Sequence, residues 1–292
     1  MRKSQLTAWG LLAPTLLVLI IVGLLPFFYV LYVGFFDWNV FSKSASLIWA
    51  GVNNYRTLVF DNEFLSALGR GVIFTLCVCA IEMSLGMLLA QLLMSEFRFK
   101  EFFRAVHALP LTIAPIAVGA VWKLMIHPGV GPIPYYLRRI GIDYNIGIPG
   151  SQAFLTTITM DIWHWTPFVT LTLLAGLSAL PHEPFEAAMV DGASRWQIFR
   201  YIQLPMLQPV IMTTLFLRIM DALRIVDEVW MLTGGGPGTS TRYAGIHVWR
   251  IVFPKTDYGY GSAMSVFLLY LTILLCWLLL TSITQARREA GR

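Results

Sequence analysis

The sequence predicts an all-α membrane protein with about six transmembrane helices, arranged as a single membrane domain over residues 1–292. Hydrophobic residues make up 57% of the chain, charged residues only 13%, and the mean hydropathy is +0.68. A soluble domain carries about a quarter charged residues, so this composition leaves too little charge to cover a soluble core. The apolar stretches show no strand-like alternation of polar and apolar residues, which disfavours a membrane barrel.

Six segments have the length and the apolar character of transmembrane helices. A helical span needs about 20 mostly apolar residues to cross about 30 Å of hydrocarbon. The predicted spans are 9–36, 71–95, 105–126, 154–177, 204–226 and 262–284. The charged residues and histidines inside them are Glu82, His107, Lys123, Asp161, His164, Arg218, Asp221 and Arg224.

Lysine and arginine are denser in one set of connecting segments than in the other. The two termini and the loops 96–104 and 178–203 together carry ten of them, whereas the longer loops 37–70, 127–153 and 227–261 together carry eight. Because cytoplasmic loops are enriched in basic residues, we expect the first set, with both termini, in the cytoplasm. The net charge of +5 is spread over many short loops, which does not indicate a nucleic-acid surface. The three cysteines lie in apolar stretches and predict neither a disulfide scaffold nor a metal site.

The predicted cytoplasmic loop 183–203 is longer than a simple connection requires. Gly192 can adopt a positive φ at low cost, so we expect two short helices that are broken there. Ser194 is a suitable N-cap for the second helix. An amphipathic elbow on the lipid surface would favour basic residues on its polar face, but acidic and basic residues are mixed in this loop. This mixture favours a docking surface for a cytoplasmic protein.

Several stretches of the chain carry a family resemblance. Within the loop these are Glu186-Ala187-Ala188, Asp191-Gly192-Ala193, Phe199, Ile202 and Leu204-Pro205. Outside it they are Gly51-Val52-Asn53-Asn54-Tyr55, Trp163 with Thr166-Pro167-Phe168, Leu232-Thr233-Gly234-Gly235-Gly236-Pro237 and Gly259-Tyr260-Gly261-Ser262-Ala263. Together they resemble the permeases of binding-protein-dependent ABC importers. Within this family the chain resembles the carbohydrate-uptake subfamily. It is most similar to the first of the two unlike permeases of maltose/glycerol-phosphate-type transporters.

Two stretches depart from the family pattern. His182 and Glu183 stand where the family usually has a Lys-Glu pair, and the stretch 243–247 is unusual after the glycine run. The second departure leaves the identity of the sugar open.

The resemblance implies the type I importer permease architecture and a set of partners. These are a second permease subunit that completes a heterodimer, two ATP-binding cassette subunits and an extracytoplasmic substrate-binding protein, all at a bacterial cytoplasmic (inner) membrane. The chain contains no Gly-x-x-x-x-Gly-Lys-[Ser/Thr] motif, so we expect no cofactor in it. ATP and magnesium would be bound by the partner ATPase, and this chain would hold no catalytic residue.

In such importers the loop that corresponds to 183–203, named the EAA loop after the motif at Glu186-Ala187-Ala188, is the coupling helix that seats in a cleft of the ATPase. The resemblance therefore implies contact and hinge roles for Glu186, Ala187, Ala188, Asp191 and Gly192. Trp196 and Phe199 are candidate apolar anchors of the same contact.

Ionisable residues inside the bilayer are costly and usually face a cavity or a partner. In the fourth predicted span Asp161, His164, Trp165 and Phe168 fall on one helix face and could hold a polyol. A buried structural network with an aromatic packing stripe explains the same pattern equally well.

The fifth predicted span adds three charged residues at intervals of three. Arg218 and Asp221 are further candidates for substrate binding, although neighbouring charges on one helix can also neutralise one another. For Arg224, pairing with a neighbouring charge is at least as good an explanation as contact with the ligand. Glu82 and Lys123 are weaker candidates for substrate binding. Each is better explained as a helix–helix partner or as a residue that reaches the membrane interface.

An intramembrane enzyme that uses Asp161 and Asp221 as a carboxylate pair is the alternative hypothesis. Arg218 lies close to Asp221 in sequence, and no His-Glu-x-x-His or Gly-x-Ser-x-Gly motif is present. An ion channel is disfavoured because there is no filter-like loop. Within the importer hypothesis, a neutral sugar, a polyol and an anionic sugar derivative remain open as substrates.

Overall fold

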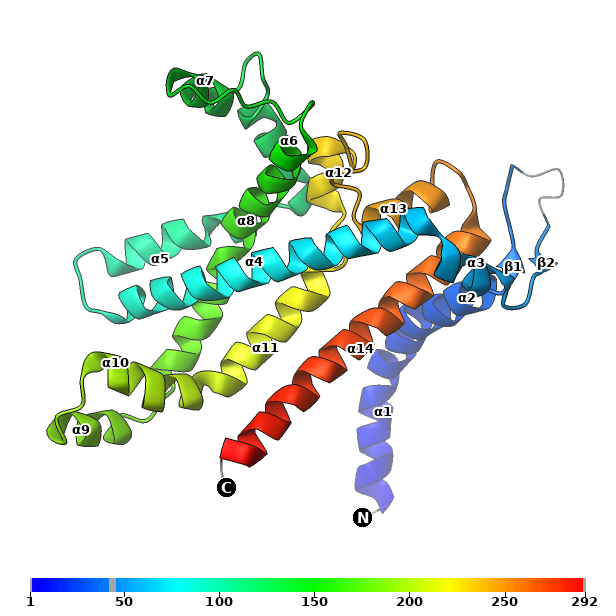
Figure 1. The fold of residues 1–292 in the computed structure, drawn as a ribbon. Helices are drawn as coiled ribbons and strands as arrows, with labels where there is room; N and C mark the ends of the chain where they lie inside the picture. Colours follow the sequence, from blue (N-terminus) through cyan, green and yellow to red (C-terminus); the bar gives the residue numbers. More distant parts are fainter. Residues whose placement is uncertain (1, 42–45, 291–292) are drawn as a thin grey trace. The chain divides into compact units, whose positions relative to one another are not determined.

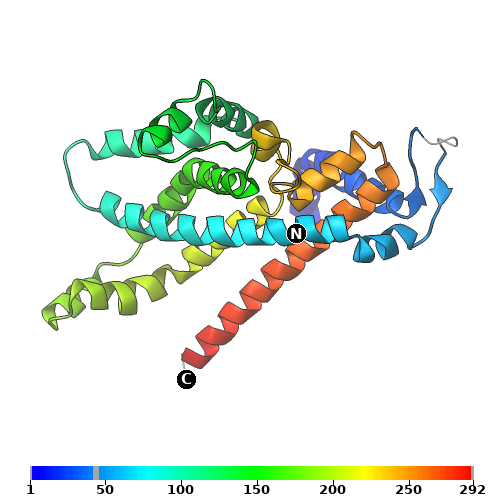
Figure 2. The same cartoon turned by 45° about the horizontal axis from the view of Figure 1, so that its top comes forward.

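The computed structural model describes residues 2–41 and 46–290, and nearly all of the regular structure among them is helical (Figure 1; Figure 2). Lys43 and Arg292, which belong to the basic residues counted above, lie outside the described residues. The chain forms two compact units, one of residues 1–65 with 247–274 and one of residues 66–246 with 275–292. The single membrane domain over 1–292 stays a prediction.

The first unit begins with a long apolar stretch of helix. α1 (Arg2–Val18), the π-helix η1 (Leu19–Leu24) and α2 (Leu25–Val33) follow one another without a break and cover most of the first predicted span. Only 6% of the most apolar 18-residue segment of this helix is buried. An apolar helix that is exposed on all sides suits a lipid environment, as expected for a membrane span.

A short hairpin follows this helix within the first unit. β1 (Phe36–Asp37) pairs antiparallel with β2 (Ile48–Trp49), and α3 (Asn53–Phe60) follows the second strand. The Asn54 side-chain amide donates hydrogen bonds to the backbone oxygens of Gly34 and Phe36 at 3.0 and 2.8 Å. These bonds hold α3 against the end of the first span.

The later part of the first unit contains the second part of α13 (Ala244–Val252) and the first half of α14 (Tyr258–Ala290). The Tyr260 hydroxyl donates to Asp61 Oδ2 at 2.7 Å, which fastens the start of α14 to the residue that precedes α4 (Asn62–Met94). Burial alone would raise the pKa of Asp61, but hydrogen bonds from Tyr260 and from backbone N–H groups outweigh it and lower that pKa.

The second unit contains most of the remaining helices. After α4 they are α5 (Lys100–Ala108), the 3₁₀ helix η2 (Leu109–Thr112), α6 (Pro115–Met125), α7 (Pro132–Arg139), α8 (Gly150–Ser178), α9 (Glu183–Val190), α10 (Arg195–Ile198), the π-helix η3 (Phe199–Gln203), α11 (Leu204–Ala222) and α12 (Asp227–Thr233). In both ribbon views α9 and α10 lie at one end of α8 and α11, and α12 lies at the other (Figure 1; Figure 2).

Four of the described helices are long and apolar enough to cross a membrane, or five if a bent pair counts as one span. The four overlap the first, second, fifth and sixth predicted spans, and the bent pair overlaps the third. The fifth span was predicted to reach residue 226, but its helix ends at Ala222, so Arg224 lies beyond it. The fourth predicted span is α8, whose 29 residues are long enough for a crossing. Its sequence is more polar than those of the other spans because it carries Asp161 and His164 among several threonines.

The third predicted span, 105–126, is not one continuous helix, which corrects the sequence-based expectation. The segment Lys100–Thr112 and α6 meet at an angle of 98°. The backbone of Ile113 and Ala114 is extended, with ψ of 130° and 138°. Pro115 begins α6, and a residue before proline is disfavoured in the helical region, so the helix stops and restarts there.

Two apolar clusters fill the second unit. One joins α4, α6, α8 and α12 around Phe74, Val118 and Ile158, and the other joins α4, α8 and α11 around Ala90, Leu173 and Leu207. Glu82 on α4 and Asp161 on α8 lie between positions that belong to the two clusters. The polar site described next is therefore enclosed by apolar side chains along these helices.

Candidate functional site

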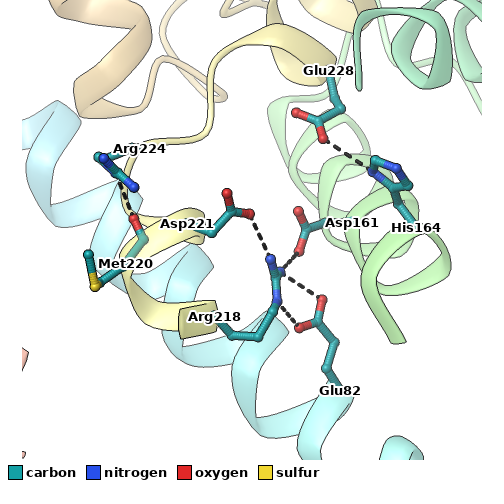
Figure 3. A network of polar contacts seen from close by, with 8 residues as sticks. All are labelled: Glu82, Asp161, His164, Arg218, Met220, Asp221, Arg224 and Glu228. Carbon is teal, nitrogen blue, oxygen red and sulfur yellow. Dashed lines mark hydrogen bonds and ion pairs between the residues drawn. The ribbon is translucent and has the colours of Figure 1, made fainter. Parts of the chain in front are cut away.

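One arginine organises the polar centre of the second unit. Arg218 on α11 donates hydrogen bonds to carboxylates on three helices, as Figure 3 shows. Nε and Nη2 bind Glu82 of α4 at 2.7 and 3.0 Å, Nη2 also binds Asp161 of α8 at 2.7 Å, and Nη1 binds Asp221 of α11 at 2.8 Å. We call these four residues the Arg218 network.

Three of the four residues are shielded from solvent. The side chains of Arg218, Glu82 and Asp161 are almost completely buried, whereas the Asp221 side chain is 49% exposed. Removing one member of a buried ion pair leaves its partner uncompensated, which costs about 3–5 kcal/mol. Arg218 therefore pairs with Asp221, which was the alternative to a substrate role, and Glu82 forms the helix–helix contact that was one of its two expected roles.

The aromatic side chains of the predicted stripe surround the network. The Arg218 guanidinium lies over the Trp165 ring, 4.8 Å from its centroid. Trp165 also contacts Phe168 edge-on, with the two ring centroids 6.1 Å apart. The predicted face of α8 therefore forms, and Trp165 links its charged part to its apolar part.

A second pair lies beside the network. His164 Nδ1 and Glu228 Oε1 are 3.3 Å apart, and both side chains are nearly buried (Figure 3). Sequence reasoning did not include Glu228, because it lies in the first turn of α12 and beyond the fifth predicted span. The available signal was an acidic residue within the apolar stretch that follows Asp227.

Arg224 makes no ion pair with Asp221, the neighbour that its spacing of three residues suggested. Its Nε donates to the backbone oxygen of Met220 at 2.9 Å. With Trp165, Asp221, Asp227 and others it lines a cavity of about 260 Å³. This cavity is the solvent-accessible side of the polar centre.

Lys123 lies apart from the Arg218 network. Its exposed side chain lines a separate cavity of about 630 Å³ together with Trp230 and the turn at Gly234 and Pro237. Among the described residues Lys123 makes no ion pair.

The loop 183–203 has the predicted local structure. α9 and α10 are separate helices, and Gly192 between them has a φ of +79°. Ser194 caps α10, since its hydroxyl accepts a hydrogen bond from the Gln197 backbone N–H at 3.4 Å. Gln197 returns the contact by accepting from the Ser194 N–H at 2.7 Å, which completes a capping box that sequence reasoning did not include. The predicted break and the predicted cap are confirmed.

The candidate coupling residues form an accessible surface. No residue of α9 or α10 is buried. Glu186, Ala187, Asp191, Gly192 and Trp196 are exposed, and Ala188 and Phe199 are half-buried. Trp196 is 68% exposed and packs on Phe199, with the ring centroids 5.5 Å apart. Their contact with a partner stays a prediction.

Comparisons with known proteins agree with this architecture. Residues 82–288 match the family model described as "Binding-protein-dependent transport system inner membrane component". A probable ABC transporter permease, y4oQ of Sinorhizobium fredii, is 32% identical over 279 residues, covering 94% of this chain and 90% of that protein.

Two further relatives have more specific names. The trehalose/maltose transport permease MalF of Thermococcus litoralis is 35% identical over 83% of this chain and 79% of its own length. The sn-glycerol-3-phosphate transport permease UgpA of Agrobacterium fabrum is 30% identical over 93% of this chain and 92% of its own length.

A solved structure shows the fold. A chain of a bacterial alginate ABC transporter, crystallised with its alginate pentasaccharide-bound periplasmic protein, superposes with a TM-score of 0.81 at 20% identity. The superposition covers 95% of this chain and 93% of that one. The chain belongs to the family of binding-protein-dependent transport system inner membrane components and is a multi-pass ABC transporter permease rather than an enzyme.

Proposed function

We propose that the chain is the transmembrane subunit of an ATP-driven importer for a sugar, a polyol or a sugar derivative, and that it forms half of the translocation pathway. The relatives named for trehalose and maltose and for glycerol-3-phosphate support this substrate class. The fold shared with the alginate transporter chain is consistent with it.

The proposed assembly contains four kinds of partner. A second, unlike permease lines the other half of the pathway, two ATP-binding cassette subunits bind ATP and magnesium, and an extracytoplasmic binding protein delivers the substrate. Membrane lipid surrounds the apolar helices. Both termini and the loop 183–203 face the cytoplasm of a bacterial cell, as the distribution of basic residues predicts.

The observation that carries the proposal is the position of the loop relative to the polar centre. α9 and α10 present an exposed surface with no buried residue, which suits contact with an ATPase. From Arg195 the chain continues without a sharp break to Ala222 as one helical segment of 28 residues, and this segment carries Arg218 and Asp221. A displacement of the loop would therefore reach the Arg218 network through a single helical rod.

The permease contributes two arrangements of packed helices, and nucleotide binding in the ATPase changes their populations. Substrate enters from the binding protein, is held near Asp161, His164, Trp165, Phe168, Arg218 and Asp221, and leaves toward the cytoplasm. Carboxylates accept hydrogen bonds from sugar hydroxyls, and aromatic rings cover the apolar faces of a sugar. No covalent chemistry takes place in this chain.

Substitution of Gly192 tests the coupling role. Proline cannot adopt the positive φ of +79° found there, so Gly192→Pro should disrupt the turn between α9 and α10. Gly141→Pro is a matched control, because Gly141 has a φ of +81° and, like Gly192, has no neighbouring atom near its missing Cβ. Proteoliposomes that contain both permeases and the ATPase report ATP hydrolysis and sugar uptake together.

We expect Gly192→Pro to hydrolyse ATP without uptake or to lose ATP hydrolysis that depends on the binding protein, while Gly141→Pro keeps both activities coupled. Normal coupled uptake by Gly192→Pro would reject the coupling role of the loop. An assembly that takes up no sugar of any class, even with all wild-type subunits, would reject the substrate proposal itself.

A further inference from the structure

The proposed function leaves open whether the transported sugar carries an acidic group. The relatives do not settle this question, since one is named for uncharged disaccharides and another for a phosphate ester. The balance of charges around the polar centre bears on it directly. The inference that follows rests on the proposed function, because it concerns the same site.

The positive charge of Arg218 is already used within the chain. Each of its three side-chain nitrogens donates to a carboxylate, and four hydrogen bonds connect it to Glu82, Asp161 and Asp221. One guanidinium therefore faces three carboxylates. An anionic sugar would have to displace one of these short contacts and would then lie beside the displaced carboxylate. The like charges would repel, most strongly at the buried Glu82 and Asp161.

One oxygen of the network is an unused acceptor. Asp161 Oδ1 is buried and has no hydrogen-bond partner among the described residues, although Oδ2 of the same side chain binds Arg218. In Figure 3 this free oxygen points away from Arg218, toward the space between Asp221 and Glu228. Buried polar atoms are usually paired, so an unpaired carboxylate oxygen suits a hydroxyl or ammonium group that donates to it.

The cavity beside the Arg218 network also has more acidic than basic residues in its lining. Asp221, Asp227 and Glu228 line its 260 Å³ volume, and Arg224 is its single basic residue. Arg224 is exposed and its Nε is held by the Met220 backbone oxygen. Asp221 belongs to both groups, so the network and the cavity together hold five carboxylates and two guanidinium groups.

The cavity also offers an apolar surface. Trp165 is half-buried, lines the cavity and lies beneath Arg218. An indole ring beside carboxylate acceptors can cover the C–H face of a sugar ring while the carboxylates accept its hydroxyl protons. Arg224 is the one cavity residue that would attract a carboxylate, sulfate or phosphate on the ligand, and the carboxylates of the cavity outnumber it.

From this free acceptor, the engaged arginine and the acidic cavity, we infer that the permease selects a sugar or polyol without an acidic group and accepts an amino sugar. Asp221 and Asp227 are the residues that exclude acidic sugars. They do so by repulsion, which is a common source of discrimination between ligands of similar shape.

Uptake measurements test the class of the substrate. Proteoliposomes with the complete transporter and its binding protein are offered neutral, amino and acidic mono- and disaccharides. Uptake limited to neutral or amino sugars supports the inference, and ATP-dependent uptake of a uronate, sulfated or phosphorylated sugar overturns it. Absence of uptake for every sugar rejects the proposed function instead, so the two failures are distinguishable.

A binding measurement without the binding protein separates the selectivity of the permease from that of the binding protein. Binding of the transported sugar and of its carboxylate analogue is measured on the purified complex of both permeases and the ATPase, without the binding protein. The wild-type complex should bind the carboxylate analogue about tenfold more weakly or worse. In the variant Asp227→Asn this difference should shrink by about threefold or more, because one source of like-charge repulsion in the cavity is removed.

Asp143→Asn is the control, because it removes an exposed carboxylate that does not line the cavity. It should leave the wild-type preference unchanged. Retained binding of the neutral sugar by Asp227→Asn shows that its site is folded. Equal binding of both ligands to the wild-type complex, or an unchanged preference in Asp227→Asn, would overturn the inference.

Discussion

One helical segment, Arg195–Ala222, joins the second half of the loop 183–203 to Arg218 and Asp221, but the loop and the Arg218 network are held by different kinds of interaction. The loop is exposed and is organised by neighbours in sequence, since Ser194 and Gln197 cap each other across three residues. The network is buried and joins residues that are 57 and 136 positions apart in the chain. This contrast indicates that the loop can move without unfolding the protein, whereas the network fixes how three helices pack.

Replacing the arginine of the network should have the largest effect. Arg218→Met fills similar volume but leaves three carboxylates without their cation, which should destabilise the folded permease by about 3–5 kcal/mol. Thermal unfolding of the detergent-solubilised protein measures the loss. Adding Glu82→Gln and Asp161→Asn to Arg218→Met should recover part of the stability, because the uncompensated charges are removed. Unfolding of Arg218→Met at the wild-type temperature would show that the network does not hold the helices together.

The pair beside the network should show a smaller effect. Glu228→Ala removes the contact with His164 from a nearly buried site, and losing a hydrogen bond to a charged group costs about 1.5–3 kcal/mol. Asp227→Ala is the matched control, since Asp227 is an exposed acid in the same first turn of α12. The same unfolding measurement distinguishes them. Equal losses in the two variants would assign the effect to the helix terminus rather than to the pair.

The cap of α10 should show the smallest effect and a local one. Ser194→Ala removes an N-cap, which is typically worth about 1 kcal/mol. Because the loop is exposed, we expect faster hydrogen exchange of the amides of 195–198 and no change in the unfolding temperature of the whole protein. Ser194→Thr keeps the hydroxyl and should exchange like the wild type. A fall in global stability with Ser194→Ala would mean that loop and network are not separable.

The same contrast explains what could be predicted from the sequence. The break at Gly192 and the cap at Ser194 depend on residue types in short stretches, and both were predicted. Length and hydropathy likewise identified the first, second, fifth and sixth spans as helices, whereas the third span is bent and α8 is less apolar than the others. The face of α8 that carries Asp161 and Trp165 follows from helical periodicity.

Features that depend on distant partners could not be predicted in the same way. Periodicity identifies a charged face but does not say which helix packs against it, so the bidentate contact of Glu82 with Arg218 appeared only in the structure. Glu228 was missed because α12 lies beyond the fifth predicted span. The bend before Pro115 was missed because hydropathy averages over a window and does not register a local break.

The most direct test of the account asks which side of the membrane the loop faces and what covers it. A single cysteine is introduced as Ala187→Cys in a variant without Cys77, Cys79 and Cys276, and a membrane-impermeant maleimide is applied to either side of the membrane. Val130→Cys, at a position that is 79% exposed in the loop 127–153, is the control for the opposite side.

The account predicts that Ala187→Cys reacts only from the cytoplasmic side and is protected when the ATPase subunits are bound. Val130→Cys should react only from the outside, whether or not the ATPase is present. Labelling of Ala187→Cys from the outside, or labelling that the ATPase does not reduce, would contradict the claim that this loop receives the force of ATP hydrolysis.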